Sequence, residues 1–200
     1  GEAIGALDFV VEGGDTTNRA ESNDDESIQS AATSWSQFVE DYFAGLTLRT
    51  ADGRPTPLFV VPGNHEGSNA VGFHKPMTPA TDRTPLVDIF NRMMAPATVM
   101  VSEVFDYRRD RVLHAADIGG LHLEFQHIWP DSVGRAWMDR DLATVSVQKP
   151  VLIFTHDQPD VEAKHFINPN PPSFESNSVI PGSGMPSSST VVGIRPVLPW

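Results

Sequence analysis

Three short apolar segments of this 200-residue chain each end in polar side chains that can bind a metal ion. The segments read FVVEGGDTTN, FVVPGNHE and VLIFTHD, and the polar residues at their ends include Asp15, Asn64 and His156. In open α/β sheets, ligands bind beyond the carboxyl ends of the strands, so residues that are distant in sequence can share one crevice. We therefore expect Asp15, Asn64 and His156 to converge on one site.

These residue types suit a metal site of mixed oxygen and nitrogen ligands. An aspartate has two oxygens and can bridge two cations, an asparagine oxygen coordinates without adding charge, and a neutral imidazole adds a nitrogen, a set suited to Zn, Fe or Mn. The chain has no cysteine, which excludes thiolate ligands and disulfides. Glycines precede Asp15 and Asn64, where a sharp turn and close backbone approach are expected.

Short apolar runs alternate with helical patterns, which indicates an α/β fold. Residues 111–127 contain two β-like runs about Gly119-Gly120, which predicts a hairpin. From 26 to 48, apolar residues recur at three- and four-residue steps after an acidic stretch at 24–26 that suits a helix N-terminus. Its aromatic stripe from Trp35 to Tyr42 is expected in the core. Buried strands are expected at 6–11, 57–63 and 149–156, and further helices at 85–95 and 132–145.

Length and composition favour one domain over residues 1–200, with the proline- and serine-rich part from 168 to 200 as a loop-rich tail of that domain. The formal net charge of -12 disfavours duplex nucleic acid as a partner. No apolar run approaches the roughly 18 residues of a membrane helix, so no membrane partner is expected. The sequence makes no prediction of the oligomeric state.

Two of these blocks together resemble a known family. GGDTTN and GNHE are similar to the GDxx(D/N) and GNH(D/E) blocks of the calcineurin-like metallophosphoesterases, the superfamily that includes purple acid phosphatases. FTHDQP resembles the family's later block with a metal-binding histidine, and the match spans Phe9 to about Pro159. The resemblance implies an αββα sandwich of two mixed β-sheets flanked by helices, incomplete at both ends.

The resemblance also implies roles for individual residues. Asp15 would bridge two divalent or trivalent metal ions (Fe, Zn or Mn), and Asn64 and His156 would ligate the second ion. His65 would be catalytic, contacting the substrate phosphate or assisting the leaving group, while Asn18 matches the last position of the first block. The implied reaction is hydrolysis of a phosphoester substrate by a metal-bridging hydroxide.

Two blocks of the family are missing from the chain. No Asp-x-His occurs anywhere in it, and no GHxH follows His156. We expect it to be an internal piece of a longer enzyme, with degeneration as the competing explanation. On either account it should bind at most one metal ion and turn over slowly or not at all. By analogy with acid phosphatases, a secreted or periplasmic location is favoured over a cytoplasmic one.

Other interpretations of the same residues stay open. The chain could be a non-catalytic metal- or phosphate-binding domain of the same fold, or a metal-free α/β binding module in which Asp15 only forms a turn and His156 is only hydrogen-bonded. Three further histidines, His114, His122 and His127, are expected to be structural or solvent-facing, with His127 a candidate for the cleft rim. The residues expected to orient metal-bound imidazoles are His74, His165, Glu66 and Asp157.

Overall fold

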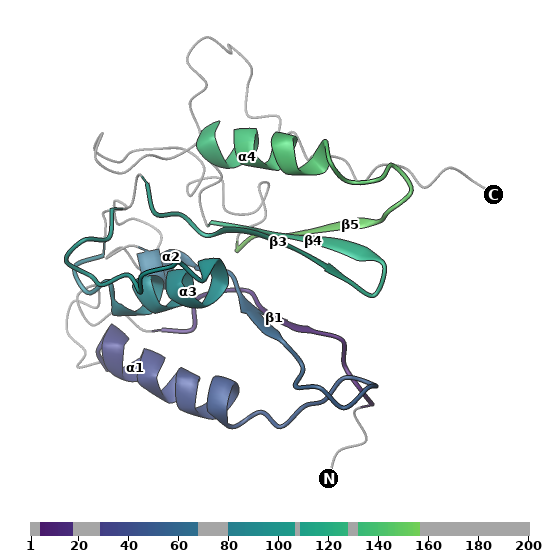
Figure 1. The fold of residues 1–200 in the computed structure, drawn as a ribbon. Helices are drawn as coiled ribbons and strands as arrows, with labels where there is room; N and C mark the ends of the chain where they lie inside the picture. The colour runs from purple at the N-terminus through teal and green to yellow at the C-terminus, as the bar shows by residue number, and fades with distance from the viewer. Residues whose placement is uncertain (1–4, 18–28, 68–79, 107–108, 128–131, 157–200) are drawn as a thin grey trace.

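The computed structural model describes residues 5–17, 29–67, 80–106, 109–127 and 132–156, which form a mixed α/β fold with two small β-sheets and several helices (Figure 1). Several sequence predictions lie outside the described residues. They concern the tail at 168–200, the acidic run at 24–26, and Asn18, His74, Asp157 and His165.

The first sheet pairs β1 (Val10–Glu12) with β2 (Leu58–Val60) in parallel. Both strands are shorter than the segments predicted at 6–11 and 57–63. Because the pairing is parallel, the carboxyl ends of both strands lie at the same edge of the sheet. The two loops that carry the first two predicted site blocks therefore leave the sheet side by side.

The second sheet has the order β3-β4-β5 and is mixed. β3 (Leu113–Ile118) and β4 (Leu121–Gln126) form the predicted antiparallel hairpin, and both turn residues, Gly119 and Gly120, have positive φ, as a tight two-residue hairpin turn requires. β5 (Val151–Phe154) pairs with β4 in parallel.

The first helix differs from its predicted bounds of 26 to 48. α1 (Ala31–Phe38) begins after Ser30, whose Oγ accepts a hydrogen bond from the Thr33 backbone N–H at 3.2 Å and so caps the helix. The helix continues with π-helical geometry as η2 (Val39–Ala44) and ends there. The predicted helix included residues 29–30 and 45–48, which are not helical in the structure, so the prediction was wrong there.

The remaining helices agree better with the sequence. α3 (Thr84–Met94) matches the predicted 85–95, and α4 (Ser132–Leu142) matches most of 132–145. α2 (Asn64–Gly67) is a single turn that directly follows the loop after β2. Within the described ranges, none of the helices is long and apolar enough to cross a membrane.

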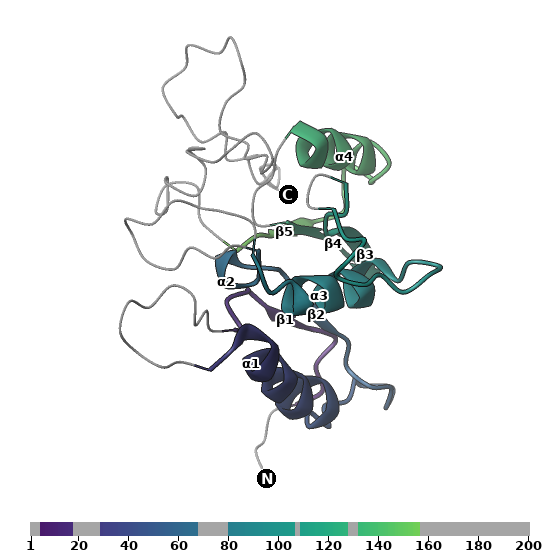
Figure 2. The same cartoon turned by 90° about the vertical axis from the view of Figure 1, so that its left-hand side faces the viewer.

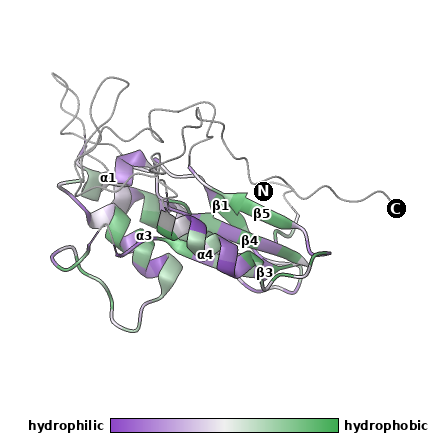
Figure 3. Ribbon diagram, turned by 90° about the horizontal axis from the view of Figure 1, so that it is seen from above, coloured by the Kyte–Doolittle hydropathy of each residue, from purple (hydrophilic) through white to green (hydrophobic). Residues whose placement is uncertain are grey.

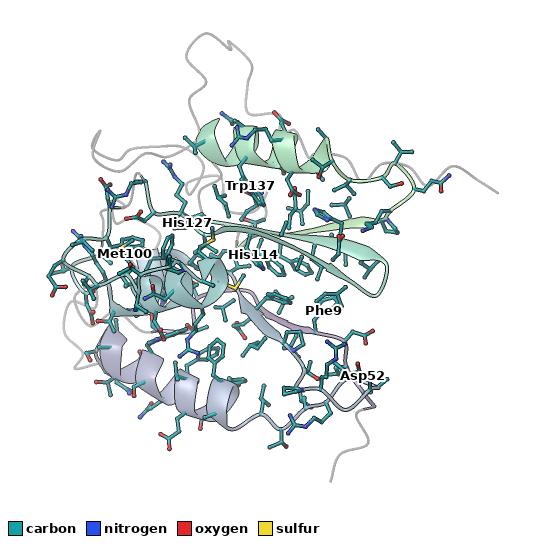
Figure 4. The ribbon with its side chains drawn as sticks, in the orientation of Figure 1. Phe9, Asp52, Met100, His114, His127 and Trp137 are labelled. Atoms are coloured by element: carbon teal, nitrogen blue, oxygen red, sulfur yellow. The ribbon has the colours of Figure 1, made fainter. Side chains whose placement is uncertain are left out.

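Aromatic side chains join the two sheets. Phe59 of β2 stacks on Phe125 of β4 with ring centroids 4.5 Å apart, and Phe125 also stacks on Phe154 of β5 at 5.2 Å. Phe9 and His114 lie in the same space between the sheets (Figure 4). In Figure 2, the two sheets lie between α4, which covers the outer face of the three-stranded sheet, and α1, which covers the outer face of β1 and β2.

Two predictions of burial were wrong. In the aromatic stripe, Trp35 and Phe38 are buried, but Tyr42 is 46% exposed because it only covers the outer face of the Phe38 ring. β5 is strongly hydrophobic (Figure 3), yet its Leu152 and Ile153 are 41% and 37% exposed. This strand lies at the edge of the described sheet and has β4 as its strand partner.

Candidate metal centre

The loops after β1 and β2 approach each other so closely that Gly14 and Gly63 have no room for a side chain. Gly14 has φ +95°, and a Cβ there would lie 2.7 Å from the Gly63 N and 2.8 Å from the His156 Nδ1. Asp15 also has positive φ, at 58°, a conformation that aspartate tolerates better than most residues. A Cβ on Gly63 would collide with the Asp15 carboxylate. The glycines before both blocks thus allow the close approach expected from the sequence.

The structure brings Asp15, Asn64 and His156 together. The Oδ2 of Asp15 lies 3.3 Å from the Nε2 of His156, and the Oδ1 of Asn64 lies 3.3 Å from the same nitrogen. If the Asn64 amide is rotated by 180°, its nitrogen takes the place of this oxygen and lies 3.2 Å from the Asp15 Oδ2. The three side chains come from the ends of β1, β2 and β5.

The orientation of His156 suits a metal ligand. Its Nδ1 lies 2.7 Å from the Gly13 carbonyl oxygen, which can only accept, so the Nδ1 carries a proton and donates. In the neutral ring, Nε2 then presents its lone pair to Asp15 and Asn64. A ring held by one nitrogen against a carbonyl, with the other nitrogen facing carboxylate and amide oxygens, is the usual arrangement of a metal-bound histidine.

The Asn64 amide gives a test of whether a cation fits. As placed, its oxygen faces only hydrogen-bond acceptors, namely the His156 Nε2 and the Asp15 carboxylate. Three electron-pair donors that face one another are favourable when they share a cation. The alternative is an amide rotated by 180°, in which the nitrogen donates to Asp15 and His156 and no cation is needed. The donor set fits a metal ion, and the rotated amide is the competing arrangement.

His65 lies beside Asp15 but is held differently from His156. Its backbone N–H donates to the Asp15 Oδ1 at 3.0 Å, and its Nδ1–H donates to the Thr17 carbonyl at 2.7 Å. The Nε2 lies 3.6 Å from the Asp15 Oδ2, and the side chain is 22% exposed. This nitrogen therefore points to the carboxylate from a position that solvent reaches.

Glu66 is hydrogen-bonded to the loop that carries Asp15. Its side chain is fully buried, and its Oε2 accepts from the backbone N–H of Gly63 at 2.8 Å and of Asp15 at 3.0 Å. Its Oε1 accepts from the Thr16 hydroxyl and from the backbone N–H and hydroxyl of Thr17. The sequence predicted Glu66 as an orienting group for an imidazole, whereas the contacts show that it fastens the Asp15 loop to α2.

The charge state of Asp15 follows from its neighbours. Partial burial raises the pKa of its carboxyl, but the hydrogen bond from a protonated His156 ring and the positive charges of protonated His65 and His156 outweigh burial, so the pKa lies below its usual value. The side chain keeps 31% of its surface exposed. The carboxylate is therefore ionised at neutral pH and open to an ion from solvent.

Comparison with known proteins identified no relative of this chain. No family model, curated protein or solved structure matches the chain. The site must therefore be interpreted from its own geometry.

Of the other histidines, His114 is half-buried and His127 is buried. His114 packs against Phe59 and Phe125, and burial lowers its pKa. His127 is 4% exposed, and burial followed by the charge of Arg111 lowers its pKa to about 3. The burial of His127 agrees with the structural role expected for these histidines and not with its candidate place on a cleft rim.

One polar cluster was missed by the sequence analysis. His122 and Glu124 on β4 meet Asp141 on α4, and one potential ligand atom from each lies within 4.8 Å of the other two. The spacing of His122 and Glu124 places both on one face of a strand, which was visible in the sequence. What the sequence did not show is that a helix covers this face.

Proposed function

We propose that this chain is a metal-dependent phosphoester hydrolase domain with the αββα sandwich of the calcineurin-like metallophosphoesterases. The observation that carries the proposal is the convergence of the Asp15 Oδ2, the Asn64 amide and the His156 Nε2 at 3.3 Å. The two sheets packed through Phe59 and Phe125, with helices on their outer sides, support the sandwich. A secreted or periplasmic location is part of the proposal by analogy alone.

Asp15, Asn64 and His156 would hold one divalent ion, with Mn²⁺, Zn²⁺ or Fe²⁺ suited to the donor set. When bound, such an ion supplies positive charge for phosphate oxygens and makes water more acidic. The Gly13 carbonyl orients His156, and Glu66 holds the Asp15 loop in position.

His65 would act on the substrate through its Nε2. Since its Nδ1 proton is committed to the Thr17 carbonyl, Nε2 can donate a proton only when the ring is an imidazolium. Donation to a phosphate oxygen or a leaving oxygen by such a group contributes on the order of 10² to 10⁴-fold to a rate.

A second candidate function rests on the ligand count. Among the described residues, no further histidine or carboxylate closes a three-ligand group with Asp15 and His156. A centre of this size holds a single ion, whereas the family reaction uses two. This favours, as the alternative, a non-catalytic domain that binds a metal ion or a phosphate ligand.

Equilibrium dialysis with Mn²⁺ and Zn²⁺ tests the metal centre. We expect Asp15→Asn and His156→Ala to weaken binding at this centre by at least about 100-fold, which removes one ion per chain from the total, since each substitution removes a direct ligand where even orienting groups matter about 10–100-fold. Asp41→Asn, at an exposed position on η2, is the matched control and should bind as the unaltered chain does. Equal binding by Asp15→Asn and Asp41→Asn would exclude the centre.

Hydrolysis of p-nitrophenyl phosphate in the presence of Mn²⁺ or Zn²⁺ separates the two candidate functions. Slow turnover that is lost in Asp15→Asn supports the hydrolase. Metal binding that depends on Asp15, combined with no turnover, supports the non-catalytic domain. Metal binding without any dependence on Asp15 or His156 supports neither.

A further inference from the structure

The face of β4 that α4 covers carries ionisable groups instead of apolar ones. Leu123 and Phe125 point to the core between the sheets, so His122 and Glu124 point the other way, toward α4. There they meet Asp141. His122 is 7% exposed and Glu124 is fully buried. Figures 1 and 2 show α4 lying over this face, on the opposite side of the sheet from β1 and β2.

His122 is held between two carboxylates. Its Nδ1 lies 2.8 Å from the Asp117 Oδ1, and its Nε2 lies 2.6 Å from the Asp141 Oδ2. Lys149 donates to the other Asp117 oxygen at 2.7 Å, which keeps Asp117 ionised and fixes it as the acceptor for Nδ1–H. In the neutral ring, the Nε2 lone pair would then face the Asp141 carboxylate. Either a second proton or a cation is needed between them.

Glu124 is the second observation that calls for a cation. Among the described residues, no hydrogen-bond donor contacts either oxygen of its carboxyl, although the side chain has no exposed surface. The ionisable groups beside it are His122 and another acid, Asp141. A buried carboxyl without a donor is costly, and a cation shared with Asp141 would remove that cost.

We propose that the His122 Nε2, Glu124 and Asp141 form a binding site for a divalent transition-metal ion between β4 and α4. Asp117 would be the positioning residue that holds the His122 ring in its metal-binding tautomer. One nitrogen and two carboxylate oxygens suit Zn²⁺, Mn²⁺ or Co²⁺, whereas Ca²⁺ and Mg²⁺ prefer oxygen alone. The ion would fasten α4 to the sheet. The site is separate from the Asp15 centre and does not rest on the proposed function.

The test uses the untagged chain carrying Asp15→Asn and His156→Ala, so that the first centre is removed. We expect this background to bind one Co²⁺ per chain, seen as visible absorption, and to melt at a higher temperature with Co²⁺ or Zn²⁺ than without it. Adding Glu124→Gln or Asp141→Asn should weaken binding by at least about 100-fold and abolish the thermal shift. Asp117→Asn should weaken it by about 10–100-fold.

Glu40→Gln is the matched control, because Glu40 lies exposed on η2, outside the cluster. Far-UV circular dichroism checks that each variant is folded. If Glu124→Gln does not fold, the Asp141→Asn variant alone tests the site, since Asp141 is 24% exposed and its substitution disturbs the interior less. The proposal is overturned if the background binds no Co²⁺. It is equally overturned if a folded Glu124→Gln or Asp141→Asn variant binds Co²⁺ as tightly as Glu40→Gln does.

Discussion

The buried Glu66 carboxylate accepts a hydrogen bond from the backbone N–H of Asp15, which lies 51 positions earlier in the chain. Through this bond, and three more from Thr16 and Thr17, the loop that presents Asp15 is fastened to α2. Asp15 is thus held by the same short helix that supplies Asn64 and His65.

Replacing Glu66 by glutamine should destabilise the protein by about 3 kcal/mol, since an NH₂ group would face backbone N–H donors that now share a carboxylate. Metal affinity should fall as well, because Asp15 loses its support. Urea unfolding and Mn²⁺ dialysis measure the two effects. Glu103→Gln, at an exposed turn, is the control, and equal urea midpoints for the two variants would contradict this role of Glu66.

Gly63→Ala should disrupt the centre through its new Cβ. That atom would overlap the Asp15 carboxylate and lie 2.5 Å from the Asp15 backbone N, so the loop must move. We expect a loss of about 1–3 kcal/mol, as for other overpacked sites, together with weaker metal binding. Gly13→Ala, where no atom lies within 4 Å of the added Cβ, should change stability by less than about 0.5 kcal/mol. Similar losses for both variants would show that the close approach does not matter.

His127 should make stability depend on pH. Its pKa is lowered from 6.5 to about 3 by burial, so between these values only the unfolded chain binds the proton. Stability should therefore fall as the pH drops below about 6.5, with a slope of up to about 1.4 kcal/mol per pH unit from this group. His127→Gln should remove that part. Urea unfolding from pH 7 to pH 5 checks it, and parallel losses in both proteins would contradict it.

Phe125→Ala should be among the most damaging core changes. The ring is fully buried and stacks on Phe59 and Phe154, so its removal leaves a cavity where the two sheets meet. We expect a loss of about 3–5 kcal/mol in the free energy of unfolding. Val99→Ala, at a residue 72% exposed, should have little effect. A small loss for Phe125→Ala would mean that the sheets do not depend on this contact.

The meeting of Asp15 and Asn64 could be anticipated from sequence, because each follows a short apolar strand and parallel strands end at one edge of a sheet. His156 was expected at the same site, but it reaches Asp15 from β5 of the other sheet, so its contact depends on how the two sheets pack, which the sequence does not show. The hairpin about Gly119 and Gly120 was equally visible, since paired glycines suit its turn. The start of α1 was not, because the acidic stretch was a plausible helix start and only the structure shows that Ser30 takes the capping position.

Features that depend on long-range packing were beyond the sequence. His122 and Glu124 alternate with Leu123 and Phe125, a pattern typical of a strand with one solvated face. Only the position of α4 turns that face into an interior one. Tyr42 was misjudged for the converse reason, because its helical spacing predicted burial where nothing among the described residues fully covers it.

The hydrogen bond between the Gly13 carbonyl and the His156 ring joins positions 143 residues apart. During synthesis, the proposed centre is therefore incomplete until β5 and His156 have been made. An ion that then binds there at about 100 times its dissociation constant would add about 2.7 kcal/mol to the stability of the native state.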